Sequence, residues 1–363
     1  MKVVYPHMGH LNIPISHMLD ILNISYVQLP NITKRTVELG AFHSPEGVCL
    51  PYKITMGNLL EGIDAGANCL VTMCGPGKCR LGFYNTVQKI GISKVTSTPL
   101  TFHAINSSTG LFNSLYKFLR QASPRSSRVA IIYSIAKAVK MLKAIDAMSD
   151  AKNYYGPRSN RPELVIGIYK ANVTRLARCQ GFWDIEYIKN DTIEIMKSCA
   201  DEDRTPLKVG ILGEFYVVME PFVNFEIEDT LVKMGIETKR FISTGDWAYA
   251  QTLLRALKLY NEETEHLHDA RPYMNYHVGG EGLQSASNAI WCAKSGYDGI
   301  IHAYPFGCMP EVVAEYSLKH ITNDYDLPML TISLDEHSSD VGILTRLEAF
   351  IDCLHFRKAC KFH

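Results

Sequence analysis

Four cysteines stand in turns that are rich in glycine and proline. Cys49, Cys74 and Cys79 lie early in the chain, and Cys308 lies far downstream. Thiolates select zinc or iron–sulfur clusters among the common biological metals. A cysteine in a tight turn beside a glycine is better placed to bind a metal than one inside an apolar helix. These four residues are therefore the candidate metal and cofactor ligands.

The spacing of these cysteines favours a cluster over a zinc ion. Structural zinc sites commonly use two close cysteine pairs, whereas here only Cys74 and Cys79 form a close pair. A cluster assembled from several loops agrees better with this pattern, and we expect a 4Fe-4S or a larger iron–sulfur cluster. A zinc-stabilised structural protein, or plain turns with buried thiols, remain the alternatives. Cys79 decides whether the ligand set has three or four members, and three would leave one iron open to substrate.

Other polar residues near these turns could move protons. Glu46 shares a loop with Cys49, His302 lies in a predicted strand, Glu311 opens the next helix, and His337 follows the last strand. Each is a candidate catalytic residue that could transfer a proton to a reduced substrate. The alternative for each is a helix cap, a surface charge or a satisfied core group.

Charge and composition limit the class of protein. The 363 residues carry 37 lysines and arginines against 37 aspartates and glutamates, which predicts no nucleic acid or anionic membrane as a partner. The 47% hydrophobic and 20% charged residues are typical of a soluble globular protein. We see neither a signal peptide nor an apolar run of the roughly 20 residues that span a bilayer, so we expect a cytoplasmic protein.

Hydrophobic periodicity predicts alternating strands and helices at both ends of the chain. The predicted strands span residues 2–5, 25–29, 68–73, 94–97, 207–212, 237–242, 298–304 and 329–334. The predicted helices span residues 11–22, 50–65, 83–90, 111–121, 128–151, 162–177, 191–200, 220–234, 247–263, 282–295, 310–320 and 341–356. Helices between apolar strands predict parallel pairing through right-handed crossovers.

This order predicts an α/β protein with two Rossmann-like domains, each holding a four-stranded parallel sheet. Residues 1–100 would form the first domain, 101–205 a mainly helical insertion or linker, and 206–363 the second domain. Both domains place a cysteine just after their third strand, at the edge where parallel α/β sheets hold ligands. If the domains face each other, we expect the four cysteines to converge on a cluster at the domain interface. Glycine-rich turns at 213–214 and 279–285 are a weaker sign of an anion site at a helix N-terminus.

The cysteine turns also resemble a known family. The sequence is similar to the 2-hydroxyacyl-CoA dehydratase D-component family, and most of all to its CoA-enzyme-activase-related branch and to the related double-cubane cluster protein. The likeness spans nearly the whole chain. The stretches that carry it are 44–53, Cys74-Gly75-Pro76, Cys79-Arg80, 212–215, 279–282, 305–311 and 335–337.

The resemblance implies α/β domains around an oxygen-sensitive iron–sulfur cluster bound by cysteines from both ends of the chain. It also implies a partner, an ATP-hydrolysing activase of the actin-like and hexokinase-like type, which injects one electron at very low potential. In the dehydratases this electron makes a ketyl radical that expels a β-proton and hydroxide. In the double-cubane relatives it serves the reduction of small molecules at an eight-iron cluster.

The chain departs from the dehydratase pattern because it is shorter and has no recognisable CoA pocket. The leading hypothesis is therefore an iron–sulfur oxidoreductase that reduces a small substrate, with cluster ligands possible across a homodimer. The alternatives are a 2-hydroxyacyl-CoA dehydratase component, which would be a radical lyase, and a non-catalytic electron carrier.

Overall fold

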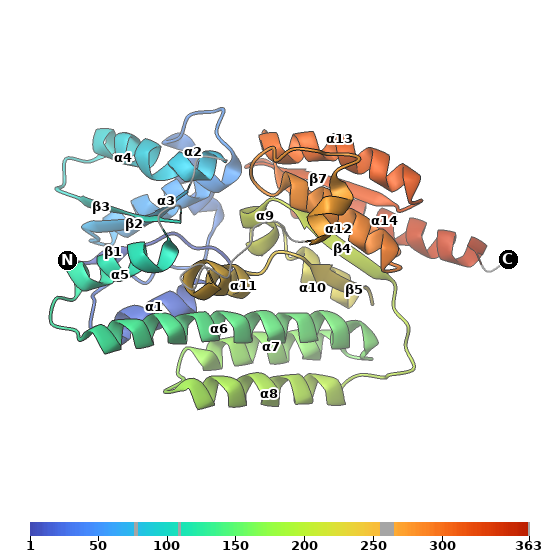
Figure 1. Cartoon of the computed structure of the whole chain (residues 1–363), viewed down its shortest axis with the longest axis horizontal. Helices are drawn as coiled ribbons and strands as arrows, with labels where there is room; N and C mark the ends of the chain where they lie inside the picture. Colours follow the sequence, from blue (N-terminus) through green and yellow to red (C-terminus); the bar gives the residue numbers. More distant parts are fainter. Residues whose placement is uncertain (76–78, 108–109, 255–264, 362–363) are drawn as a thin grey trace. The chain divides into compact units, whose positions relative to one another are not determined.

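The computed structural model describes residues 1–363 except 76–78, 108–109, 255–264 and 362–363, and it leaves the side chains of 253, 265–267 and 361 undescribed. Two parallel sheets surrounded by helices confirm the predicted α/β class (Figure 1). The chain divides into two compact units. The N-terminal unit holds residues 1–144, 179–182 and the segment from Thr244, and the C-terminal unit holds the remainder. The boundary cuts the predicted middle segment 101–205, so its residues are shared between the units.

The N-terminal unit is built on a parallel sheet, which has three strands among the described residues. The strands, in the order β1-β2-β3, are β1 (Val3–Val4), β2 (Cys69–Cys74) and β3 (Thr101–Asn106). The helices are α1 (Asn12–Ile21), α2 (Lys34–Phe42), α3 (Leu50–Asp64), α4 (Tyr84–Val95), α5 (Leu111–Ala122) and α11 (Thr244–Tyr249), with short helical turns η1 (Arg80–Phe83) and η3 (Ala250–Leu254). The long helix α6 (Arg128–Tyr155) begins in this unit.

Both faces of this sheet are covered around β1 and β2, whereas the edge strand β3 is partly exposed. Cys69 packs in a cluster with α1, α5 and the start of α6, whereas its neighbour Leu70 packs with α3 and α4. This alternation is what a covered parallel sheet requires, because successive side chains point to opposite faces. Cys69 is therefore core packing, as its apolar surroundings in the sequence predicted.

Two predicted strands of this unit differ from the structure. The strand predicted at 94–97 is wrong, because α4 continues to Val95 and the strand follows at Thr101–Asn106. A short apolar run carries too little periodicity to separate a helix end from a strand. The strand predicted at 25–29 is reduced to a single parallel bridge between Val3 and Tyr26. The predicted four-stranded sheet is therefore present only as three strands in the described part of this unit.

The C-terminal unit contains a four-stranded parallel sheet, as predicted, and the strands stand in the order β5-β4-β6-β7. The strands are β4 (Lys208–Gly213), β5 (Glu237–Arg240), β6 (Gly299–Pro305) and β7 (Met329–Leu334). The helices are α7 (Pro162–Leu176), α8 (Phe182–Ser198), α9 (Phe215–Met219), α10 (Ile227–Lys233), α12 (Gly282–Lys294), α13 (Met309–Asp324) and α14 (Asp340–Lys361), with short turns η2 (Gly156–Arg158) and η4 (Glu265–Ala270). Helices α12 and α13 pack on one face of the sheet through Leu212 and Ile300.

Several predicted helices have different bounds. The helix predicted at 191–200 begins earlier, at Phe182. The helix predicted at 220–234 begins only at Ile227, since a separate helix α9 ends at Met219 and a turn follows it. The helix predicted at 247–263 is described up to Leu254, and its remainder lies outside the described residues. None of the described helices is long and apolar enough to span a membrane.

Ion pairs hold α6 and α7 to α10 within the C-terminal unit. Lys152 on α6 lies 2.5 Å from Asp229 on α10, with side chains only 3% and 9% exposed. Lys170 on α7 reaches the same carboxylate at 2.9 Å. These two lysines hold the pKa of Asp229 below its ordinary value, against the effect of its burial. Removing one partner of such a pair would leave an uncompensated buried charge, so the helices are held in one register.

Helices α2 and α3 approach each other at backbone distance. A Cβ atom on Gly40 would lie 1.7 Å from the carbonyl oxygen of Lys53, and one on Gly57 would lie 2.0 Å from that of Thr36. Only glycine is accommodated at both contacts without a shift of the backbone. This contact positions the first turn of α3, where Cys49 stands.

We predict that Gly40→Ala destabilises the protein by about 1–3 kcal/mol, because the added methyl group overpacks the α2–α3 contact. Urea unfolding followed by circular dichroism measures the change. The matched control is Gly167→Ala on α7, where a Cβ would meet nothing within 4 Å. That control should be neutral or stabilising by up to about 1 kcal/mol. Equal stability of Gly40→Ala and the wild type would contradict the close approach.

Candidate functional site

Three of the predicted ligands stand at the ends of elements in the N-terminal unit. Cys49 is the N-cap residue of α3, Cys74 is the last residue of β2, and Cys79 is the N-cap residue of η1. Pro51 in the first turn of α3 has the fixed backbone angle that a helix start accepts. Neither N-cap cysteine uses its sulfur to cap its helix.

Hydrogen bonds join the three cysteine turns. Arg80, next to Cys79, donates from Nη1 to the carbonyl oxygen of Gly47 at 2.6 Å. The amide of Gly75, next to Cys74, donates to the carbonyl oxygen of Gly82 at 3.5 Å. The three turns thus lie in one region of the N-terminal unit, whereas the predicted convergence of all four cysteines stays a prediction.

Cys49 makes the most specific contact of the three. Its sulfur lies 2.7 Å from the hydroxyl oxygen of Tyr84, the first residue of α4. The ring of Tyr84 in turn packs edge-on against Tyr52 at 5.1 Å. Cys49 is buried, and it stands at the positive end of the α3 dipole, which favours a thiolate. Burial raises the pKa of the Cys74 thiol.

The charged residues in and beside these turns have different placements. Arg80 is engaged with Gly47, and Lys53 is buried within α3. Lys78 lies outside the described residues. Glu46 is exposed in the turn before Cys49. A proton-transfer role for Glu46 stays a prediction.

The fourth predicted ligand belongs to the other unit. Cys308 is buried as the N-cap residue of α13 and follows Gly307, whose φ of +74° favours glycine. Its role as a ligand stays a prediction. His337 is exposed in the turn after β7, where its backbone N–H donates to Asp335 Oδ1 at 2.9 Å. This geometry makes it part of a surface turn.

His302 and Glu311 are brought together in the C-terminal unit. His302 Nε2 lies 2.8 Å from Glu311 Oε2, and both side chains are 0% exposed. Ser285 on α12 donates its hydroxyl to the same carboxylate oxygen at 3.0 Å. The sequence identified both residues as candidates but contained no sign that they are in contact, since nine positions separate them.

Two acids near this pair were missed as functional residues. Glu214 follows β4 and is buried, and its carboxylate accepts a hydrogen bond from the amide of Val217 at 3.0 Å. Glu281 precedes α12 and is partly buried. Burial first, and then the charge of Glu311, raises the pKa of each to about 7. The glycine-rich turns 213–214 and 279–285 were the signal, but their buried acids disfavour the anion predicted there.

The strand order explains why these residues meet. In the order β5-β4-β6-β7, the chain leaves β4 towards one side of the sheet and β6 towards the other. Ligand sites of open α/β sheets lie at this switch point, beyond the carboxyl ends of the strands. Glu214 comes directly after β4, and Glu311, the partner of His302 in the middle of β6, lies in the first turn of the helix that follows β6.

The described residues form no site for a single metal ion. Among the described residues, no group of three or more His, Cys, Asp or Glu side chains is placed to hold one metal ion. A cubane differs from a single-ion site because each cysteine binds a different iron atom. Its thiolates therefore stand farther apart than the ligands of one ion.

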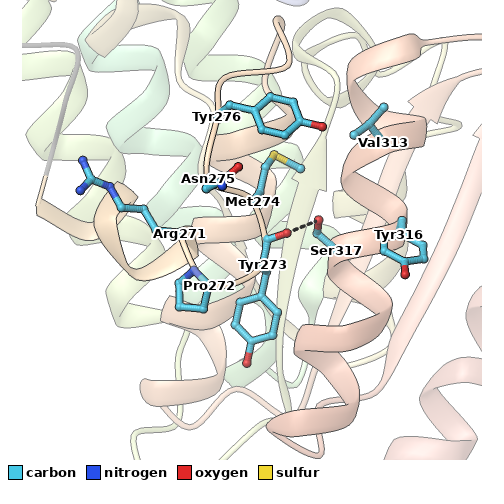
Figure 2. A pocket seen from close by; sticks show the side chains of 9 residues that line it. All are labelled: Arg271, Pro272, Tyr273, Met274, Asn275, Tyr276, Val313, Tyr316 and Ser317. Carbon is cyan, nitrogen blue, oxygen red and sulfur yellow. Dashed lines mark hydrogen bonds between the residues drawn. The ribbon is translucent and has the colours of Figure 1, made fainter.

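A pocket of about 460 Å³ lies elsewhere in the C-terminal unit, between the segment 271–276 and helix α13. Figure 2 shows Tyr276 and Met274 on one side and Val313 and Tyr316 on the other. The hydroxyl of Ser317 donates to the carbonyl oxygen of Tyr273 at 3.1 Å across it. The pocket contains none of the predicted site residues.

Comparison with known proteins adds no assignment. No family model matches the chain, and no curated protein matches its sequence.

We predict that Glu214 makes the stability of the protein depend on pH. Its pKa is about 7 in the folded state against an ordinary value of 4.5, so the folded state holds the proton more tightly. The contribution of Glu214 to the free energy of unfolding should therefore be fully present below about pH 4.5 and be lost, by about 3 kcal/mol, as the pH rises through 7. Urea unfolding at a series of pH values measures this fall.

The variant Glu214→Gln should show a smaller fall over the same pH range, because it has no proton to lose. Glu348→Gln, at an exposed position on α14, is the control and should follow the wild type. Parallel pH profiles for Glu214→Gln and the wild type would refute the assignment.

Proposed function

We propose that the protein binds an iron–sulfur cluster through Cys49, Cys74 and Cys79 and uses it to reduce a small substrate. The observation that carries this proposal is the joining of the three cysteine turns. Arg80 connects the Cys79 turn to the Cys49 turn, and Gly75 connects the Cys74 turn to Gly82, which follows Cys79. Three soft sulfur donors from one region are the ligand type that iron–sulfur clusters use.

The surroundings of the sulfurs fit a cluster. A Cβ atom on Gly47 would meet nothing within 4 Å, and one on Gly75 would meet only Ser107 Oγ and Gly82 Cα, at 3.4 and 3.8 Å. There is thus space beside the backbone of both turns. When bound, the cluster would accept and pass on single electrons. The residues of this chain would hold it, surround it with partly buried turns, and donate a hydrogen bond from Tyr84 to the Cys49 sulfur.

The family resemblance supports the rest of the proposal. It favours an ATP-hydrolysing activase as the electron-donating partner and a homodimer as the assembly. With three cysteine ligands one iron would be open to a substrate, whereas Cys308 as a fourth ligand would favour a carrier or a larger, double-cubane-type cluster. A 2-hydroxyacyl-CoA dehydratase component is the alternative activity, and tight acyl-CoA binding would favour it.

We expect the anaerobically purified protein to be brown and to contain iron and acid-labile sulfide in equal amounts. Cys49→Ser, Cys74→Ser and Cys79→Ser should each lower the affinity for the cluster by more than about tenfold. Metal analysis and visible absorption spectra measure the loss. Cys353→Ser, at an exposed position on α14, is the matched control and should keep the full iron content.

The outcomes separate the hypotheses. A colourless wild-type protein without iron would overturn the proposal, and zinc in place of iron would identify a structural site. Loss of iron in Cys308→Ser would identify Cys308 as the fourth ligand. Retention of iron in all three single variants of the N-terminal unit would exclude them as ligands.

We further predict that Tyr84→Phe keeps the cluster but lowers its reduction potential. Hydrogen bonds to ligand sulfurs stabilise the reduced, more negative cluster, and this variant removes the hydroxyl that lies 2.7 Å from Cys49. Redox titration followed by electron paramagnetic resonance measures the potential. Tyr52→Phe is the control, because its ring also packs beside this site. An unchanged potential in Tyr84→Phe would contradict the contact.

A further inference from the structure

Four ionisable side chains gather at one edge of the C-terminal sheet, and each comes from a different element. Glu214 follows β4, His302 lies on β6, Glu281 precedes α12, and Glu311 lies in the first turn of α13. The amide of Glu214 donates to the carbonyl oxygen of Ala303 at 3.0 Å, which places it beside the strand that carries His302. A Cβ atom on Gly282 would lie 2.6 Å from the carbonyl oxygen of Pro310, which places Glu281 beside the start of α13 and Glu311. The four groups therefore lie at one site.

The hydrogen bonds of this site are unevenly distributed. One oxygen of Glu311, Oε2, has two partners, His302 Nε2 and Ser285 Oγ. Its other oxygen, Oε1, has none, and neither has Nδ1 of His302. Both side chains are fully buried, where an unpaired polar atom is costly. The site thus has unused capacity to hold and pass a proton.

Positive charge does not balance the acids. In the part of the chain that the structure describes, His302 is the only basic side chain in an ion pair with Glu214, Glu281 or Glu311. Among the described residues, these three carboxylates have no lysine or arginine as a partner; Glu214 and Glu311 are buried and Glu281 is partly buried. They therefore repel one another, and protonation relieves the repulsion. The raised pKa values of Glu214 and Glu281 agree with this, since both are about 7.

Other titratable groups surround the site, and they leave its net charge negative. Glu220 and Tyr216 lie near Glu214, and Glu315, with Lys319 and Tyr304, lies on the side of His302. Tyr304 donates its hydroxyl to Glu315 at 2.7 Å. Burial, Glu315 and then Cys308 raise the pKa of Tyr304. Lys319 forms an ion pair with Glu315 at 2.8 Å, so its charge balances Glu315.

We propose that Glu214, Glu281, Glu311 and His302 form an internal proton store that exchanges protons with solvent. In each exchange a carboxylic acid gives one proton to water or to a basic oxygen or nitrogen of a small molecule, and a carboxylate remains. No electron moves in this step. Glu281 is the most exposed of the three acids and is the route by which the store refills. The store is independent of the iron–sulfur proposal, because it contains no cysteine.

Infrared spectroscopy and potentiometric titration test the store directly on the full chain. The carbonyl band of protonated carboxyl groups should persist at about pH 6 and disappear by about pH 8. Over that range the wild type should release more protons than Glu214→Gln or Glu281→Gln, each of which should lose the share of about one carboxyl group. Glu348→Gln, exposed on α14, is the control and should titrate as the wild type does.

Disappearance of the band below about pH 5 would overturn the proposal, and so would identical titrations of the wild type and both glutamine variants. If Glu214→Gln does not fold, Glu281→Gln decides the question alone, because its side chain is only partly buried and makes no capping hydrogen bond. The measurement needs no cluster, so its failure and the failure of the iron–sulfur proposal are distinguishable.

Discussion

The parallel pairing of β4 with β6 is the constraint on which the C-terminal site depends. Gly213, at the end of β4, has a φ of +133°, and a Cβ atom there would lie 1.8 Å from the carbonyl oxygen of Ala303. Only glycine lets the two strands end in contact. Because the chain turns away at this point, Glu214 is placed against β6 and is withdrawn from water. A second close approach joins the starts of α12 and α13. A Cβ atom on Gly282 would lie 2.6 Å from the carbonyl oxygen of Pro310.

The N-terminal unit uses the same physical device for different chemistry. Gly40 and Gly57 allow α2 and α3 to pack at backbone distance, and this fixes the first turn of α3. Arg80 then holds the Cys79 turn to the Cys49 turn through one hydrogen bond. A residue with a Cβ atom could not be placed at these close contacts without a shift of the backbone. In both units the contact lies beside the candidate site residues.

The two sites differ in the chemistry that their donors favour. Sulfur donors beside open glycine turns favour soft metal ions and electron transfer. Carboxyl groups withdrawn from water, which among the described residues pair with one imidazole and with no lysine or arginine, favour the exchange of protons. Reductive chemistry needs both electrons and protons, and the chain provides a candidate source for each in a separate compact unit.

Local patterns in the sequence were enough to predict the α/β class, the parallel sheets, and the positions of Cys49, Cys74 and Cys308 at element ends. These features depend on apolar periodicity and on glycine and proline in turns, which act over a few residues. The strand at Thr101–Asn106 was not predicted, because a short run gives too little periodicity.

Only the tertiary structure decided which side chains meet. The contact of His302 with Glu311, the joining of Glu214 and Glu281 to that pair, and the contact of Tyr84 with Cys49 all depend on strand order and register. The sequence also did not show that the turn at Gly213 holds a buried acid, because burial results from packing by distant elements. The chemistry of a carboxyl group depends on that burial, so the proton store could be inferred only from the fold.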